Sequence, residues 1–600
     1  MLLWLGLSSA SSVSEKTINV VIERVASRLP PLYDTTPCLS YVHPSGCTFV
    51  YAWRPSISSL KDYIAEDGAS LVLVSGYLSA IPPGEVERLL RSIDCSGNFP
   101  DFHIPVGGIY SMLHLRKSTG QLSAVQSKSG LEAVFERRKN ELCSISNRPD
   151  IAQIALSTSS SIAVSEKLAP RLFNSLFLID GTTHFADTFR VNKNLKITLE
   201  KGNLRSAIRI APEHSVEISD NLEEQTQIFV DILQRTIRPY EWTGSPILRV
   251  SGGRDSRLLL ALFKSNNIKC IIENHNSPHH IEGMIADMII EKVGYTESTI
   301  RNYSRMLNCS VEEAVKLGSR LRGGGPYSVP LHYPFEMDYR PKEWRAITLG
   351  HAHHMRGGFA KSMIKDRDTI LELLYRQFCS PFIKKEYHIN KEILDNLIED
   401  ITPIHDLHYM YHFYDELRVP NYLNTHFMEY TCYTLPIYPL LDEEIILFAN
   451  RLLDARQAFN MISERLFFKA TQKFEPSVCE IPLFNMRYRF ESHGMLDELG
   501  FRENYDKRDP QSLISQFENG NNASDFGGFD VPVKDYQRAD NEVLDRLLGS
   551  PRWEEWKEYL EPETIFEINS RFRKTRDKIR KKTLREFCYC MFGLDVLLES

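Results

Sequence analysis

The sequence predicts an α/β protein in which a β-rich N-terminal domain precedes a doubly wound parallel α/β domain with helical additions. Three observations predict this fold class. Residues 1–210 hold short apolar runs separated by turn residues, which is typical of strands. From about residue 222 strand-like and helix-like patterns alternate, as they do around a parallel sheet. After about residue 365 the apolar residues recur mainly at helical spacing.

The composition is that of an ordinary globular protein. The 600 residues are too many for one core, so we expect two to four domains. A net charge of −7 argues against a dedicated nucleic-acid binder. The 11 cysteines include no Cys-x-x-Cys pair, which favours reduced thiols in a cytoplasmic protein.

The first ten residues are apolar but resemble a signal peptide only superficially. They lack a basic segment and their apolar run is short, so a buried first strand is the better interpretation. No apolar run in the chain reaches the length of a membrane span. We therefore predict a cytoplasmic protein without a membrane partner.

The N-terminal region carries six strand-like runs and two helical patterns. We expect strands at 48–53, 70–76, 108–115, 142–146, 176–179 and 195–199, and helices at 86–93 and 151–156. Alternation of apolar and polar residues in such runs is typical of sheets with one buried face.

The middle of the chain follows a different pattern. We expect helices at 221–237, 257–266 and 281–293, and strands at 246–250, 269–273 and 345–350. Further helices are expected at 367–378, 391–400, 405–418, 443–454 and 461–473, a polar loop at 505–535, and a helical tail. In a doubly wound sheet, ligands bind at the carboxyl ends of the strands.

Residues 251–256, Ser-Gly-Gly-Arg-Asp-Ser, connect a predicted strand to a predicted helix. Gly252 and Gly253 permit a tight turn and leave space for a ligand. The following helix directs free N–H groups and its positive dipole end toward the loop, which favours an anion. Ser251 and Ser256 add hydroxyl donors, and Asp255 offers a hard oxygen for Mg²⁺ beside a phosphate.

This segment resembles the pyrophosphate loop, Ser-Gly-Gly-x-Asp-Ser, of the ATP pyrophosphatases, a group that includes the asparagine synthetases. The layout of the chain resembles an asparagine synthetase as well. The resemblance implies a glutaminase-like sandwich of the N-terminal-nucleophile type at 1–212 and an ATP pyrophosphatase domain at 220–490. Residues 491–600 would form a helical extension. Weaker matches lie at 107–113, 142–148 and 180–185.

The chain departs from this family at three places. An active glutaminase of the family needs Cys at position 2, where this chain has Leu2, so glutamine is not the expected source of the amine. At 350–359 the family's acidic motif is replaced by Gly350, His354 and neighbouring histidines. The family's catalytic lysine would fall near Leu483, and Lys469 is a candidate substitute, as are Lys473, Arg487 and Arg489.

Two arginines flank Asp255 in the predicted phosphate loop. Arg254 occupies the variable position of the loop, and Arg257 begins the helix, where a cation opposes the dipole unless an anion lies close. Because Arg forms bidentate contacts with phosphate, we expect both residues to assist nucleotide binding. At 350–359, either Mg²⁺ depends on Asp255 and the phosphates, or the histidines and Arg356 neutralise pyrophosphate directly.

Other patterns favour structural interpretations. The turn Pro439-Leu-Leu-Asp442 resembles a family turn that packs helices on the sheet. His405, His408 and His412 share one helical face, where an aromatic wall is more frequent than a metal site. At 351–354, a phosphate-side loop that has lost its acidic residues is more frequent than a zinc site. The basic run 571–585 could bind RNA or an acidic leader peptide, but a solvated helix is the commoner outcome.

Together these observations predict an ATP- and Mg²⁺-dependent ligase that forms amide bonds. It would adenylate a substrate carboxylate, release pyrophosphate, and let an amine from a source other than glutamine displace AMP. The resemblance is nearest to β-lactam synthetases and lasso-peptide cyclases, which implies a small-molecule or peptide substrate and a possible precursor peptide or partner protein. Two alternatives remain: a tRNA- or sulfur-modifying enzyme of the same fold, or a catalytically degenerate nucleotide-binding protein.

Overall fold

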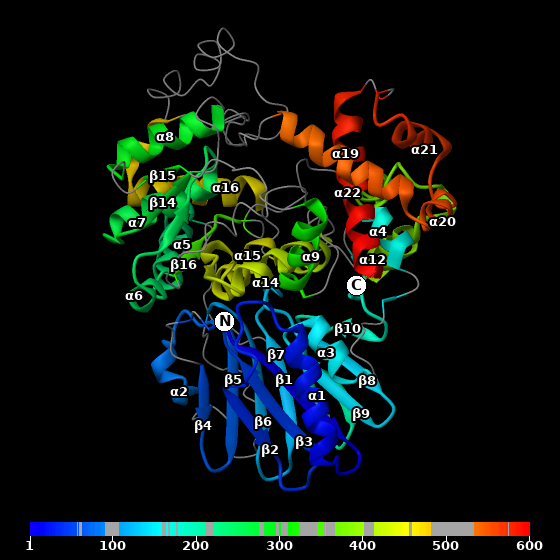
Figure 1. Cartoon of the computed structure of the whole chain (residues 1–600). Coiled ribbons are helices and arrows are strands. Elements are labelled where there is room, and N and C mark those ends of the chain that lie inside the picture. Colours follow the sequence, from blue (N-terminus) through cyan, green and yellow to red (C-terminus); the bar gives the residue numbers. More distant parts are fainter. Residues whose placement is uncertain are drawn as a thin grey trace.

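The computed structural model describes most of the chain. The described residues are 1–56, 58, 63–90, 107–158, 164–165, 168–175, 178–209, 221–274, 281–295, 299–301, 310–323, 345–352, 355, 367–400, 413–454, 459–481, 533–573, 575 and 577–599. They form two antiparallel sheets, one parallel sheet and many helices (Figure 1). The prediction of a mixed α/β chain is confirmed at this level.

Two six-stranded antiparallel sheets form the N-terminal part. The first has the order β10 (Thr188–Arg190), β8 (Phe135–Lys139), β9 (Leu142–Ser146), β1 (Leu3–Ser9), β3 (Thr48–Trp53) and β2 (Leu39–Val42). The second has the order β12 (Asn203–Ile208), β11 (Leu195–Glu200), β7 (Gln121–Gln126), β6 (Ile109–Arg116), β5 (Ser70–Tyr77) and β4 (Ile64–Glu66). Apolar side chains from both sheets share one core, so the sheets pack face to face as a sandwich.

The alternation of side chains along β1 explains how this strand serves two cores. Trp4 lies in the core between the sheets, whereas Leu5 and Leu7 belong to the core on the opposite face. Helices α1 (Glu15–Arg28) and α3 (Pro149–Ala155) pack against each other and supply side chains to that second core. Helix α2 (Glu87–Leu90) covers part of the other sheet.

The parallel sheet has the order β15 (Thr299–Arg301), β14 (Ile271–Asn274), β13 (Ile247–Arg249), β16 (Ala346–Thr348) and β17 (Leu435–Ile437). Every neighbouring pair is parallel. The strand order runs one way from β13 to β15 and the other way from β16 to β17. The reversal between β13 and β16 is a topological switch point, where the connecting loops diverge and leave room for a ligand.

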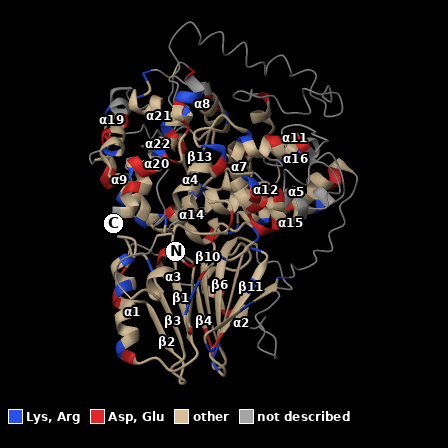
Figure 2. Cartoon of the chain, turned by 90° about the vertical axis from the view of Figure 1, so that its right-hand side faces the viewer, with Lys and Arg blue, Asp and Glu red and all other residues tan. Residues whose placement is uncertain are grey.

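Helices surround this sheet and extend beyond it. Those with a role below are α5 (Leu222–Thr236), α7 (Arg254–Ser265), α8 (Ile281–Val293), α9 (Val311–Leu321), α14 (Asn424–Thr431), α15 (Glu443–Asp454) and α16 (Phe459–Phe474). The others are α6 (Tyr240–Thr243), α11 (Arg367–Phe378), α12 (Ile389–Asp400), α19 (Val533–Gly549), α20 (Trp553–Lys557), α21 (Pro562–Asn569), α22 (Lys578–Glu599) and the π-helix η4 (Tyr414–Leu423). Figure 2 shows both signs of charge distributed over the helices, whereas the sandwich strands carry few charged residues.

One helix crosses between the two halves of the molecule. Helix α4 (Leu168–Ser175) comes from the N-terminal part of the sequence but packs against α12 and α22 (Figure 1). Phe173 contacts Trp556 edge-on, with ring centroids 5.8 Å apart, and also contacts Phe587. The C-terminal helices therefore close on a segment that the sequence pattern groups with the sandwich.

The structure corrects some predicted elements. The strand predicted at 176–179 is wrong, because Leu178 and Ile179 lie in no strand. Strands β2, β4, β7, β8, β10, β12, β15 and β17 were not predicted. No described helix has the length and apolar character needed to cross a membrane.

Candidate functional site

The predicted phosphate loop lies at the switch point of the parallel sheet. It leaves the carboxyl end of β13, and α7 begins directly after its cap residue Gly253. Helix α7 is buried over its first ten residues, from Arg254 to Phe263. The N–H groups and the positive dipole end at the start of α7 therefore lie at the carboxyl edge of the sheet, where the loops after β13 and β16 diverge.

Hydrogen bonds between the two serines hold the loop in shape. The Ser256 hydroxyl accepts from the Ser251 main-chain N–H and donates to its carbonyl, both at 3.1 Å. The two hydroxyl oxygens lie 3.2 Å apart, and the Gly253 N–H donates to the Ser251 hydroxyl at 3.3 Å. The loop is thus closed on itself before any ligand binds, a form of preorganisation.

The glycines of the site permit close approach of backbone segments. A Cβ atom on Gly252 would lie 3.0 Å from the Glu282 carbonyl oxygen of α8. A Cβ atom on Gly350, which follows β16, would lie 2.9 Å from the Ser256 nitrogen. A side chain would therefore crowd backbone atoms at both positions, more severely at Gly350, which brings the end of β16 against the phosphate loop.

Asp255 is buried at the base of the loop, with 8% of its surface exposed. One of its carboxylate oxygens accepts a hydrogen bond from the Ala352 N–H at 3.3 Å. The carboxylate thus joins the first turn of α7 to the segment after β16. It lies at the edge of the sheet where a cation beside bound phosphates is expected.

A second acidic side chain, Glu282, lies beside the loop and was not predicted. Burial raises its pKa, and a hydrogen bond with the Ser251 side chain opposes this shift. Glu282 is in the first turn of α8, which follows β14 at the same edge of the sheet. The rule that parallel strand ends gather at one edge could have identified it from the sequence.

His351 belongs to the histidine-rich segment that follows β16. Its ring stacks on Tyr438 with centroids 5.4 Å apart. Burial lowers the pKa of His351 to about 4; Asp255 opposes this shift and Arg249 adds to it. The imidazole is therefore neutral at pH 7 when no anion is bound beside it. His354, Arg356 and the histidines at 405, 408 and 412 lie outside the described residues.

The two flanking arginines differ in their surroundings. Arg254 is buried in the first turn of α7. Arg257 is also buried, but its guanidinium donates to the carbonyl oxygens of Val478, at 3.1 Å, and Ile481. One guanidinium nitrogen of Arg257 therefore holds the 478–481 segment on α7. A contact of Arg257 with phosphate remains a prediction.

Lys469, the candidate catalytic lysine, is partly buried on α16. Its positive charge lowers the pKa of Glu223 at the start of α5, where Lys473 contributes more strongly through a hydrogen bond and a 2.7 Å ion pair. These contacts associate Lys469 with α5. A role for it at the phosphates remains a prediction.

Polar side chains form a connected group from the strand ends toward α14. Arg249 pairs with Glu273 at 2.7 Å and donates to the Tyr430 hydroxyl. Next to Tyr430, Glu429 pairs with Arg322 at 2.9 Å. Burial raises the pKa of Glu429 to about 7, although Arg322 opposes the shift. This group links the phosphate-loop edge to the far end of α14.

No metal centre is formed by protein side chains in the part of the chain that the structure describes. There, no three His, Cys, Asp or Glu residues are arranged to hold an ion. Asp255 and Glu282 supply at most two carboxylates. Such a pair fits Mg²⁺ that takes its remaining ligands from water and substrate phosphates, but does not fit a structural zinc site.

The sandwich does not provide a glutaminase nucleophile at position 2. Leu2 is 7% exposed and packs in the core between the two sheets. The sandwich is joined to the part that holds the parallel sheet through Asp442, which accepts hydrogen bonds from the Gly108 N–H, at 2.6 Å, and from the Ser79 hydroxyl. The turn at 439–442 therefore contacts the sandwich directly.

The basic run 571–585 is paired with acidic side chains. Arg580 contacts Glu567 at 2.9 Å, Arg585 contacts Asp540 at 2.8 Å, and Arg571 contacts Asp545. These three arginines are therefore neutralised within the C-terminal helices. Binding of RNA or of an acidic leader peptide by the rest of the run remains a prediction.

Comparisons with known proteins give little further guidance. No family model matches the chain, and no curated protein matches it significantly. A solved structure of the allosteric regulatory enzyme of purine biosynthesis is 7% identical, and the match covers 42% of this chain and 60% of that one at a TM-score of 0.23. Glutamine phosphoribosylpyrophosphate amidotransferase from B. subtilis, complexed with ADP and GMP, is 8% identical over 55% of this chain and 94% of its own, at a TM-score of 0.22. These scores are too low to support conclusions about fold or activity.

Proposed function

We propose that the protein is an AMP-forming ligase that couples ATP cleavage to the formation of an amide bond. The observation that carries this proposal is the Ser251–Ser256 loop at the switch point between β13 and β16. The loop presents N–H groups, hydroxyls and a helix N-terminus to one small region, a combination suited to pyrophosphate.

A site that binds pyrophosphate favours attack on the α-phosphate of ATP. In the proposed reaction, a substrate carboxylate attacks that phosphorus, and pyrophosphate leaves with its negative charge stabilised by the loop. An amine then attacks the acyl carbon and AMP leaves. Leu2 in the sandwich core supports an amine that comes from the substrates rather than from glutamine.

Mg²⁺ would be held by Asp255, with Glu282 as a second or water-mediated ligand. When bound, the ion would neutralise part of the charge that develops on the departing pyrophosphate. The protein's own contribution is to fix both carboxylates beside the loop. Gly350 and Ala352 do this for Asp255, and α8 does it for Glu282.

The test is ATP–pyrophosphate exchange by the full-length protein with pooled amino acids and other carboxylic acids. Exchange that depends on carboxylate supports a ligase, whereas exchange that depends on RNA indicates a modifying enzyme, and absence of ATP binding indicates a degenerate protein. Asp255→Asn should reduce exchange by about 100-fold, because it removes a charge that acts on the transition state. The matched control is Asp231→Asn, at an exposed position of α5, which should leave exchange unchanged.

A further inference from the structure

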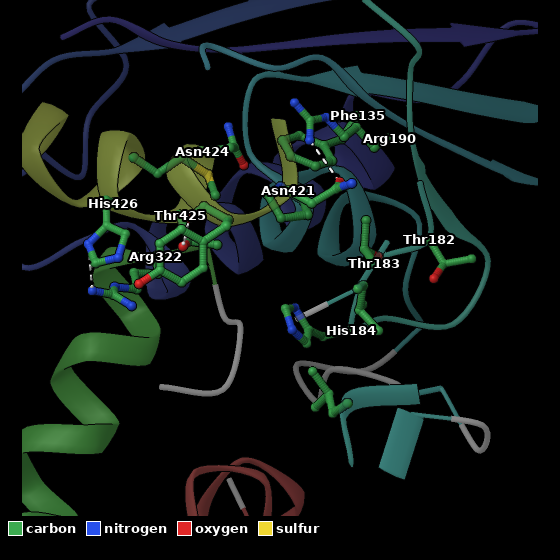
Figure 3. A pocket seen from close by; sticks show the side chains of 15 residues that line it. Phe135, Thr182, Thr183, His184, Arg190, Arg322, Asn421, Asn424, Thr425 and His426 are labelled. Carbon is green, nitrogen blue, oxygen red and sulfur yellow. Dashed lines mark hydrogen bonds between the residues drawn. The ribbon is translucent and has the colours of Figure 1, made fainter. Parts of the chain in front are cut away.

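A cavity of about 70 Å³ lies where the sandwich meets the α14 region (Figure 3). This volume has room for several water molecules or a small organic group. No residue of the 251–256 loop lines the cavity. The walls are formed by Phe135, Pro149, Leu172, Leu178, Thr182, Thr183, His184, Arg190, Arg322, Asn421, Tyr422, Asn424, Thr425, His426 and Met428.

The cavity is electropositive by composition. Among the described residues, its lining includes two arginines and two histidines but neither Asp nor Glu. In Figure 3, Arg322 and His426 lie on one side, Arg190 and Asn421 lie on another, and His184 projects from the sandwich side. Arg322 is paired with Glu429 and also contacts His426 at 3.2 Å. Because the charge of Arg322 is balanced by Glu429, the charge of Arg190 has the larger influence on which ligand the cavity can bind.

The Arg190 guanidinium contacts neutral acceptors. It donates to the Asn421 side-chain oxygen at 2.9 Å and to the Gly130 carbonyl. Burial lowers the pKa of Arg190 to about 9, and the charge of Glu416 opposes this shift. Glu416 is shared with Lys193, because one of its carboxylate oxygens lies 3.7 Å from the Lys193 ammonium. A partly buried cation that lines a cavity, and whose described hydrogen-bond partners are neutral, gains from a bound anion.

The remaining walls favour an organic anion over an inorganic one. Leu172 and Leu178 are buried apolar residues, and Met428 adds a flexible thioether opposite the sandwich. Burial lowers the pKa of His184 to about 3, so its ring is neutral and can exchange hydrogen bonds with a carboxylate without adding charge. One carboxylate and a short apolar body match this combination of walls.

We propose that this cavity binds a small monocarboxylic acid, with the carboxylate on the Arg190 guanidinium and the apolar body against Leu172, Leu178 and Met428. Because Arg190 belongs to β10 and Asn421 to η4, the ligand would join the sandwich to the α14 region. This inference does not depend on the proposed ligase function, since the phosphate loop takes no part in the binding.

The experiment uses the full-length protein without ATP and 4-methylpentanoate as the probe. Calorimetry should detect binding, and the midpoint of thermal unfolding should rise with probe concentration, since a ligand of the folded state stabilises it. The neutral isostere 4-methylpentanamide and the short anion acetate should each bind at least tenfold more weakly. Equal binding of the amide, or no binding of the carboxylate, would overturn the proposal.

Variants locate the binding. Arg190→Gln should weaken the carboxylate at least tenfold, whereas Arg205→Gln, at an exposed position of β12, should not change it. Leu178→Phe keeps Arg190 but narrows the cavity, so it should also abolish binding of the carboxylate. If Arg190→Gln does not fold, Leu178→Phe alone tests whether the carboxylate binds in this cavity. Unchanged affinity in Leu178→Phe, or in a folded Arg190→Gln, would place the carboxylate elsewhere.

Discussion

Replacing Gly350 with Ala tests whether the loop after β16 and the phosphate loop form one site. The new Cβ would lie 2.9 Å from the Ser256 nitrogen and 3.2 Å from the Asp255 carbonyl carbon. Ordinary van der Waals contact to a Cβ begins at 3.4 Å, so the two segments must separate by about 0.5 Å. Both contacts are to backbone atoms in a buried helical turn, so no flexible side chain can absorb the change.

A displacement of this size should affect binding more than folding. Misplacement by about 1 Å can cost 100-fold in enzymes, so about tenfold is the expected loss in ATP affinity for half that distance. Overpacking of this kind typically costs about 1–3 kcal/mol of stability. Calorimetry with ATP and Mg²⁺ measures the first effect, and denaturant unfolding measures the second.

The control for Gly350→Ala is Gly549→Ala at the end of α19. A Cβ on Gly549 has no neighbouring atom within 4 Å, so this variant should match the wild type in both measurements. ATP affinity within twofold of the wild type in a folded Gly350→Ala protein would refute the reasoning. In that case the segment after β16 would lie against the loop without influencing the nucleotide.

Three further predictions concern the rest of the molecule. Asp442→Ala should lower the free energy of unfolding by about 2–4 kcal/mol, because the Gly108 N–H and the Ser79 hydroxyl lose a buried acceptor. Asp442→Asn keeps an acceptor and should lose less stability. Equal losses of the two variants in denaturant unfolding would count against the hydrogen bonds. Burial raises the pKa of Glu429 from 4.5 to about 7, so the folded protein holds an extra proton in this range and loses the associated stability as the pH rises through it. Glu429→Gln should therefore reduce the fall in unfolding free energy between pH 5.5 and pH 8 by about 2 kcal/mol, measured at both pH values; an unchanged pH profile would argue against the raised pKa. The purified protein should release no glutamate from glutamine, with or without ATP, in a coupled glutamate assay, because Leu2 occupies the sandwich core; clear release would require another nucleophile.

The parts of the site that depend on local sequence could be predicted. A strand, two glycines and an apolar helix specify the turn at 251–256 through backbone conformation and periodicity, and the structure has this arrangement. Strand alternation also predicted a parallel sheet, and the parallel order brings Gly350 to the same edge. These features arise within short stretches or from general rules of topology.

Features that depend on distant partners could not be predicted. Arg257 lies beside the predicted anion site in sequence, but its side chain donates to carbonyl groups at Val478 and Ile481. Strand β8 was missed because its sequence, Phe-Glu-Arg-Arg-Lys, has the composition of a surface segment. In the sheet its buried Arg137 donates to the Gln153 carbonyl, a partner that charge patterns do not reveal.

The position of α4 has a consequence for synthesis on the ribosome. Its partner α22 begins at Lys578, about 400 residues after α4 ends, so roughly 20–80 s of translation separate the two helices at bacterial and eukaryotic rates. During that interval the apolar side of α4, including Phe173, lacks its cover from α22, Trp556 and Phe587. The nascent chain therefore has a long period in which a chaperone or a transient contact must protect this surface, and fragments cut near residue 212 should be prone to aggregate.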